Sequence, residues 1–200
     1  MAGEGGTGGP PRLEPLTPKP RVHVGALVVM QLGLLAIALV IARWQDIDPL
    51  RYMAGERTPA PMAISAVVGA LTGGVVVGLS RWGEATSASL RRMAATLAEM
   101  IGPLRMHEVA ALAVVSGVAE EILFRGVLLE WWGPFASTLV FAVLHIAPQR
   151  ELLLWPVFAA AAGGLFAALT IASGDVTAAI VAHMTINYFN LASLSEAGSD

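Results

Sequence analysis

Hydrophobic positions in this 200-residue chain fall into long continuous runs, without the alternation that is typical of strands. The first run, over 22–42, is 21 residues long, enough at about 1.5 Å per residue to cross a hydrocarbon core of about 30 Å. The second, over 62–80, holds Gly69, Gly73, Gly74 and Gly78, whose small-xxx-small spacing favours close helix packing. Both runs predict membrane-spanning helices.

Residues 81–106 show a different pattern, in which arginines alternate with leucine, methionine and isoleucine at helical spacing. This pattern predicts an amphipathic helix that lies in the membrane interface and ends at Gly102-Pro103. A solvated connecting helix is the alternative interpretation.

The second half of the chain contains four more apolar segments. Trp131-Trp132 is an expected interfacial anchor, and Asp175 is the expected cap of the last helix. The segments lie at 108–129, 134–146, 151–172 and 176–194. The pattern therefore predicts an all-α, polytopic transmembrane bundle with about six hydrophobic helices and one interfacial amphipathic helix.

Composition narrows the class of protein further. Hydrophobic residues make up 56% and charged residues 14%, where a soluble domain carries about 25% charged. The absence of cysteine excludes disulfides, a catalytic thiol and a Cys-ligated metal. A net charge of -3 without a basic patch argues against nucleic acid. Residues 1–20, rich in Gly and Pro, predict a disordered tail and not a signal peptide, and 21–195 predict a single domain.

The distribution of basic residues predicts the orientation in the membrane. With the N-terminus in the cytoplasm, eight Lys and Arg residues face the cytoplasm and three face the other side. The arginine-rich, alanine-rich and glycine-rich composition hints at a bacterial genome. We therefore expect a multi-pass protein of a bacterial inner membrane with a cytoplasmic N-terminus.

Glu120, Glu121 and Arg125 stand inside one of the apolar segments. An ionised side chain near the bilayer centre costs about 3 kcal/mol or more, so these groups need partners and an inward-facing, partly wet cavity. Glu121 and Arg125 are four residues apart and can pair on one helix face. Glu120 points about 100° away and is expected to be free for chemistry.

Three further polar side chains lie on other segments. His183 and Asn187 share one helix face, and His145 follows Phe141 at the same four-residue spacing. A bundle could bring these side chains to the carboxylates. A desolvated carboxylate is suited to act as a general base, and a His–Asn pair can stabilise an oxyanion. The set suits addition of water to an amide, although a single His or a Glu–Arg pair can also be purely structural.

The three motifs together resemble a known family. Glu120-Glu121-x-x-x-Arg125, Phe141-x-x-x-His145 and His183-x-x-x-Asn187 are similar to the three ordered motifs of the CPBP family. That family contains the CAAX prenyl endopeptidases and the bacteriocin-processing or immunity (Abi) proteins. The resemblance covers about residues 100–194, and the first two apolar runs are not diagnostic.

The resemblance implies an intramembrane glutamic endopeptidase without a cofactor. It implies that Glu120 activates water with help from His145, and that His183 and Asn187 form the oxyanion hole. Glu121 and Arg125 would hold the geometry of the site, and Glu121 could share in activating the water. The implied partners are the lipid bilayer and a protein or peptide substrate. That substrate would be a CAAX-like tail, an exported peptide or a C-terminal sorting tail. The small-residue faces would permit a homodimer.

Other readings of the same residues compete with this one. Two histidines and a glutamate could form a three-ligand zinc site, but H-E-x-x-H is absent and Asn187 is a poor ligand. Ser116-Gly117 lacks the preceding glycine of a rhomboid-like serine nucleophile, and Asp175 lacks the Gly-x-Gly-Asp context of an aspartyl protease. A non-catalytic immunity or partner protein of the same fold is the rival from another class.

Overall fold

The computed structural model describes residues 23–52 and 60–197, so the predicted tail at 1–20 lies outside the described residues. The described chain is helical, as predicted, and its residues form no strand beyond one isolated bridge between Arg51 and Asp175. The elements are α1 (Val24–Gln45), α2 (Met62–Thr86), α3 (Ala88–Ile101), α4 (Met106–Glu121), the π-helix η1 (Ile122–Leu128), α5 (Leu129–Val143), the 3₁₀ turn η2 (Arg150–Leu152), α6 (Trp155–Ser173) and α7 (Thr177–Ala197).

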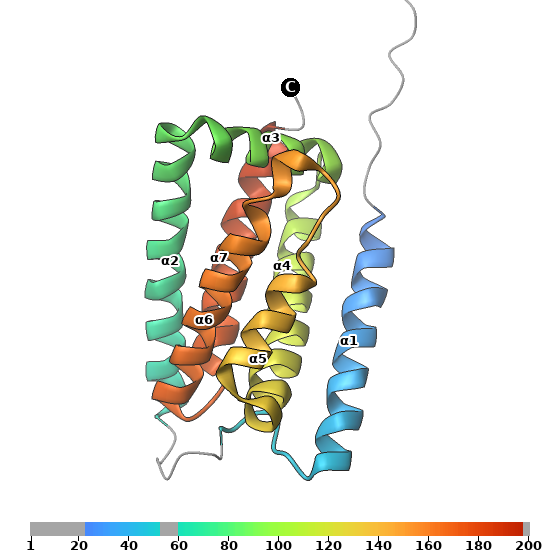
Figure 1. The fold of residues 1–200 in the computed structure, drawn as a ribbon, viewed down its shortest axis with the longest axis vertical. Coiled ribbons are helices and arrows are strands. Elements are labelled where there is room, and N and C mark those ends of the chain that lie inside the picture. Colours follow the sequence, from blue (N-terminus) through green and yellow to red (C-terminus); the bar gives the residue numbers. More distant parts are fainter. Residues whose placement is uncertain (1–22, 53–59, 198–200) are drawn as a thin grey trace, which may run out of the picture.

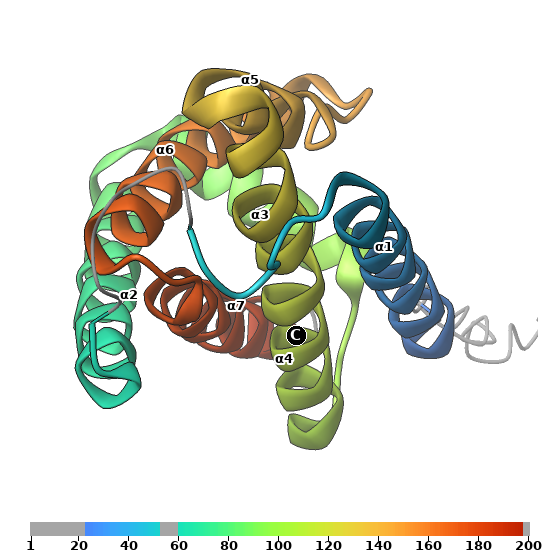
Figure 2. The same ribbon diagram turned by 90° about the horizontal axis from the view of Figure 1, so that it is seen from below.

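Helix α7 lies between α2 and α4 and also packs against α6 (Figures 1 and 2). Helix α3 crosses one end of the bundle nearly at right angles to the others (Figure 1). Helix α1 stands at the side and packs against α4 and η1 (Figures 1 and 2). The α2, α4, α6 and α7 helices thus surround the interior, and α1 covers one flank of α4.

Two of the five glycines of α2 allow α7 to approach closely. A side chain on Gly69 would collide with the backbone of Ala178, and one on Gly73 would lie 2.8 Å from the Ala182 carbonyl oxygen. Gly74 and Gly78 have nothing within 4 Å of the position of a side chain. The close-packing prediction is therefore confirmed for the first pair and wrong for the second, which faces outward.

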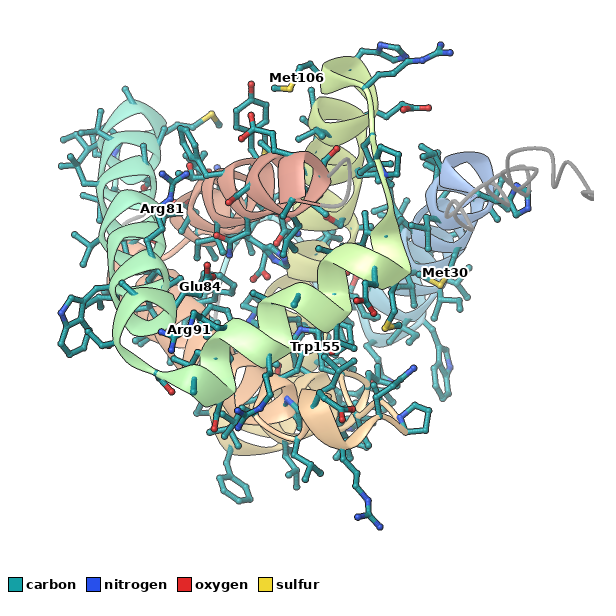
Figure 3. The ribbon with its side chains drawn as sticks, turned by 90° about the horizontal axis from the view of Figure 1, so that it is seen from above. Met30, Arg81, Glu84, Arg91, Met106 and Trp155 are labelled. Carbon is teal, nitrogen blue, oxygen red and sulfur yellow. The ribbon has the colours of Figure 1, made fainter. Side chains whose placement is uncertain are left out.

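The amphipathic helix predicted over 81–106 is present, but it begins later in the chain than predicted. Residues 81–86 continue α2, and α3 starts only after Ser87, whose Oγ accepts a hydrogen bond from the Leu90 N–H at 3.4 Å. Arg91 folds back over this corner (Figure 3) and its Nη1 donates to the carbonyl oxygens of Glu84 and Ala85 at 2.9 and 3.0 Å. These bonds satisfy carbonyls that the end of α2 leaves without helical partners.

The third predicted span continues from α4 through η1 to Trp132 and then reverses. Gly133 has φ 81° and ψ 171°, a conformation that glycine adopts easily, and Pro134 begins the second half of α5. That half folds back beside η1, where the Ser137 Oγ donates to the Phe124 carbonyl oxygen at 2.6 Å. It ends at Val143, three residues before the predicted end. The π-helix was not predicted.

Among the residues that the structure describes, three helical segments are long and apolar enough to cross a membrane: Val24–Gln45, Met62–Thr86 and Arg150–Ser173. The predicted count of about six spans is not confirmed. The outer faces of α1 and α2 expose many large apolar side chains, such as Val29 at 69% and Leu71 at 67%, which in water would be unfavourable. The exposed ring of Trp44 lies against Trp131, which stacks on Trp132, at one end of the bundle.

Candidate active site

The two adjacent carboxylates lie at the junction where α4 becomes the π-helix η1. Glu121 is the last residue of α4, and all seven residues of η1 are buried. Glu121 and Arg125 are 0% and 1% exposed, so both charges are enclosed by the bundle. A short π-helix inside a longer α-helix is frequently found at functional sites. Arg125 lies within this π-helix.

Glu121 and Arg125 form the predicted pair. Arg125 Nη1 lies 3.2 Å from Glu121 Oε1. The guanidinium carbon is 4.4 Å from the ring centroid of Phe141, and the rings of Phe124 and Phe166 lie at 5.6 and 5.3 Å. Gly163 of α6 leaves room for this arrangement, because a side chain there would lie 2.9 Å from Arg125 Nη2. The aromatic rings and the carboxylate together fix the guanidinium.

His183 of α7 lies between the two carboxylates. Its Nδ1 is 2.7 Å from Glu121 Oε1, and its Nε2 is 4.0 Å from Glu120 Oε2. The ring stacks on Phe166 at a centroid distance of 5.2 Å and an interplanar angle of 19°. Because an ionised carboxylate only accepts hydrogen bonds, Nδ1 carries the proton that faces Glu121. Nε2 is therefore the imidazole atom that faces Glu120.

Glu120 is not free, in contrast to the prediction. Its Oε1 accepts a hydrogen bond of 2.7 Å from Nε2 of Gln31, which α1 contributes. Its Oε2 faces His183, and its side chain is 13% exposed. Gln31 makes the interhelical hydrogen bond that is usual for an isolated intramembrane glutamine. Its partner, however, is the carboxylate predicted to carry the chemistry.

Asn187 lies one turn beyond His183 and one layer away from the carboxylates. Its Nδ2 donates to Ser116 Oγ at 2.9 Å, and Ser116 Oγ donates to the Leu112 carbonyl oxygen at 2.7 Å. Helices α4 and α7 run in opposite directions, so two polar layers follow one another between them. One layer contains Ser116 and Asn187, and the next contains Glu120 and His183. The structure therefore places Asn187 beside the cluster without a hydrogen bond to either carboxylate.

His145 stands apart from the cluster. It follows the end of α5, and its Nδ1 is 2.7 Å from the carbonyl oxygen of Phe141. Its half-buried ring lies between Phe141 and Trp155, at centroid distances of 4.5 and 5.4 Å. Phe141 in turn meets His183 edge-on at 6.2 Å. Phe141 thus contacts both the His145 ring and the His183 imidazole.

Sequence reasoning assigned no part in the site to three side chains that shape it, although it read Gln31 as an interhelical hydrogen bond and weighed Ser116 as a nucleophile. Gln31 and Ser116 bond directly to predicted site residues, and Phe166 orients His183. Ser116 precedes Glu120 by four residues, a spacing that would have placed it on the same face. Phe166 had no signal, because one aromatic residue in an apolar helix is ordinary.

In this arrangement the Glu120 carboxylate and the His183 Nε2 face each other. Gln31 binds the other oxygen of Glu120, and Glu121 binds the other nitrogen of His183. Such a pair suits proton transfer to and from a water molecule. In the described part of the chain, no three His, Asp or Glu side chains are grouped so that they could hold a metal ion.

The chain is similar to a known protease family over this region. Residues 103–189 match the family of type II CAAX prenyl endopeptidase Rce1-like proteins. No curated protein and no solved structure matches the chain. The resemblance to the CPBP and CAAX protease family that the motifs indicated is thereby confirmed, and it supports peptidase activity in a membrane. Together with the apolar outer helices, it identifies an integral membrane protein.

Proposed function

We propose that this protein is an intramembrane glutamic endopeptidase that hydrolyses a peptide bond of a membrane-associated protein or peptide. The observation that carries the proposal is the facing pair of Glu120 Oε2 and His183 Nε2, 4.0 Å apart at the side of a buried Glu121–Arg125 pair. The similarity of residues 103–189 to CAAX endopeptidases supports the same class of reaction.

In the proposed mechanism, Glu120 is the general base. A water molecule beside Glu120 gives a proton to the carboxylate while its oxygen attacks the carbonyl carbon of the scissile peptide bond. The carbonyl oxygen becomes an oxyanion, which two donors stabilise: Nε2 of a His183 ring protonated on both nitrogens, and the Asn187 amide. When the intermediate collapses, the C–N bond breaks and the proton held by Glu120 moves to the leaving amine. No covalent enzyme intermediate and no metal take part.

Glu121 and Arg125 act through His183. Glu121 accepts the Nδ1 proton of His183 and so keeps Nε2 directed toward Glu120. Arg125 balances the charge of Glu121 inside the bundle. His145 is the predicted assistant of Glu120, but its ring packs on Phe141 and Trp155 and its Nδ1 is 2.7 Å from the Phe141 carbonyl oxygen. We therefore assign the position nearest the attacking water to His183 and an outer position to His145.

We further propose that the protein lies in a bacterial inner membrane with its N-terminus in the cytoplasm. Arg81, Arg91 and Arg92 then lie at the cytoplasmic face, where the positive-inside rule places them. The loop that follows α1 lies at the opposite end of the bundle (Figure 1). The substrate is an exported peptide, a C-terminal sorting tail or a CAAX-like tail.

The test replaces the chromosomal gene of the native host with a Glu120→Gln variant and compares the termini of membrane and secreted proteins by mass spectrometry. The glutamine keeps the shape of Glu120 and can still accept the Gln31 hydrogen bond, so the fold should survive. Glu151→Gln is the matched control, because Glu151 is exposed and lies on the short turn η2. We expect uncleaved precursors in Glu120→Gln alone.

Unchanged termini in the Glu120→Gln strain would contradict the proposed mechanism. If a deletion strain nevertheless has a phenotype, a non-catalytic immunity or partner role would replace the protease assignment. If precursors accumulate, their sequences and termini identify the substrate and its cleavage site in the same experiment.

A further inference from the structure

Helix α1 contains one polar side chain over residues 24–42, and that side chain is Gln31. The rest of this stretch is apolar or glycine, and its outer face exposes large side chains such as Val29 and Val40. Gln31 is instead 7% exposed and turns inward. A buried amide costs free energy unless it is hydrogen-bonded, so its inward position requires a partner. That partner is Glu120, at 2.7 Å.

The orientation of this hydrogen bond is set by its chemistry. An ionised carboxylate has only acceptors, so the amide must present its N–H group to Glu120. The other amide atom, Gln31 Oε1, has no hydrogen-bond partner among the described residues. Gln31 is therefore committed to Glu120 and to no second side chain there.

The position of α1 is itself well defined beside the site. Ala38 and Ala42 are buried against residues of η1, and these small side chains bring the two helices close together. After α1, the chain passes directly over η1, since a side chain on Gly126 would collide with the Pro49 carbonyl. The amide of Gln31 is thus presented from a docked helix and not from a loose one.

From these contacts we propose that Gln31 is a positioning residue for Glu120, which holds one carboxylate oxygen so that the other faces His183 and the attacking water. Residue 31 lies outside the range 103–189 that matches the protease family. The proposal rests on the proposed function, because it assigns Gln31 to the reaction that Glu120 performs. It makes α1 a part of the active site as well as a membrane anchor.

Two variants of Gln31 separate positioning from packing. Gln31→Leu keeps a similar volume but removes the donor, and Gln31→His restores an N–H donor at a similar reach. Val40→Ala is the matched control on the same helix, because Val40 is 68% exposed on the outer face. Each variant is purified as the full chain and reconstituted into lipid vesicles.

The kinetic measurement uses the precursor peptide that accumulates in the Glu120→Gln strain. We expect Gln31→Leu to lower kcat by about 10- to 100-fold with little change in KM, because a misplaced catalytic group loses rate and not binding. Gln31→His should recover part of kcat, and Val40→Ala should match the wild type. Unchanged kcat in Gln31→Leu, with Glu120→Gln inactive in the same assay, overturns the role of Gln31 alone. Full activity in both Gln31→Leu and Glu120→Gln overturns the proposed function as well.

A second measurement needs no substrate. A hydrophobic carbodiimide modifies carboxyl groups inside membrane proteins, and mass spectrometry can follow the reaction at Glu120 and Glu121 separately. Loss of the Gln31 hydrogen bond should accelerate modification of Glu120 several-fold and leave Glu121 unchanged, since Glu121 is bound by Arg125 and His183. Equal rates at Glu120 in Gln31→Leu and the wild type would overturn the proposal whatever the enzyme cleaves.

Discussion

Replacement of Arg125 by methionine should destabilise the bundle strongly, and a second replacement at Glu121 should restore much of the loss. Arg125→Met leaves the Glu121 carboxylate, which is 0% exposed, without its cationic partner. Removing one member of a buried ion pair costs about 3–5 kcal/mol. Glu121 still keeps His183 Nδ1 at 2.7 Å, so the expected loss is about 3 kcal/mol.

The loss of the contacts between Arg125 and the aromatic rings should change the free energy of unfolding little. The guanidinium lies 4.4 Å from the ring of Phe141, a contact of about 1–2 kcal/mol. Methionine fills a similar space and makes favourable contacts with aromatic rings, so it regains most of that contribution. The loss in Arg125→Met therefore measures mainly the uncompensated charge of Glu121.

The double variant Glu121→Gln/Arg125→Met removes both charges together. Buried pairs that are replaced by uncharged side chains of similar volume are often as stable as the original. The wild-type pair also carries a cost of its own, since Arg125 Nε and Nη2 have no hydrogen-bond partner among the described residues. We expect the double variant to regain at least half of the stability that Arg125→Met loses.

The assay is reversible unfolding of the purified protein in mixed micelles with increasing sodium dodecyl sulfate, followed by circular dichroism. Val143→Met, on an exposed side of α5, is the control for a new methionine in the bundle. A loss below about 1 kcal/mol in Arg125→Met, the range of an exposed ion pair, would refute the reasoning. So would a double variant that is less stable than Arg125→Met.

Three further predictions concern packing, orientation and metal. Gly73→Ala should lose about 1–3 kcal/mol in the same unfolding assay because its side chain would meet α7. Gly74→Ala, with open space around it, should be neutral or gain up to about 1 kcal/mol; equal effects at both positions would argue against the close approach of α2 and α7. Because the chain has no cysteine, single Leu50→Cys and Ser89→Cys variants can be labelled with an impermeant thiol reagent. Ser89→Cys should react only from the cytoplasmic side and Leu50→Cys only from the other, and the reverse pattern would invert the proposed topology. Cleavage of the precursor peptide should persist in excess chelator, whereas loss of activity that zinc restores would favour a metalloprotease.

The helical class and the main polar pair could be predicted because both depend on local spacing. Continuous apolar runs exclude alternating strands, and a four-residue spacing puts Glu121 and Arg125 on one helix face whatever surrounds them. The structure has that pair at 3.2 Å. The capping role of Asp175 was equally local, and its Oδ1 accepts the Thr177 N–H at 2.7 Å.

Helix ends and helix faces were harder to predict where neighbouring helices decide them. Residues 81–86 joined α2 because Ser87 and Arg91 make the corner there, which the amphipathic pattern does not reveal. The π-helix has no sequence signal, because its seven residues would suit an ordinary α-helix equally well.

By itself, the sequence determined that this protein is an all-helical membrane protein and which few polar residues its interior must accommodate. Tertiary structure alone decided which of those residues meet across different helices. His183 reached both carboxylates and His145 did not, because α7 packs along α4 while the turn after α5 places His145 against Phe141 and Trp155. Gln31 joined Glu120 across 89 residues of sequence because α1 docks on α4. Periodicity specifies a face of one helix, but only packing specifies what that face meets.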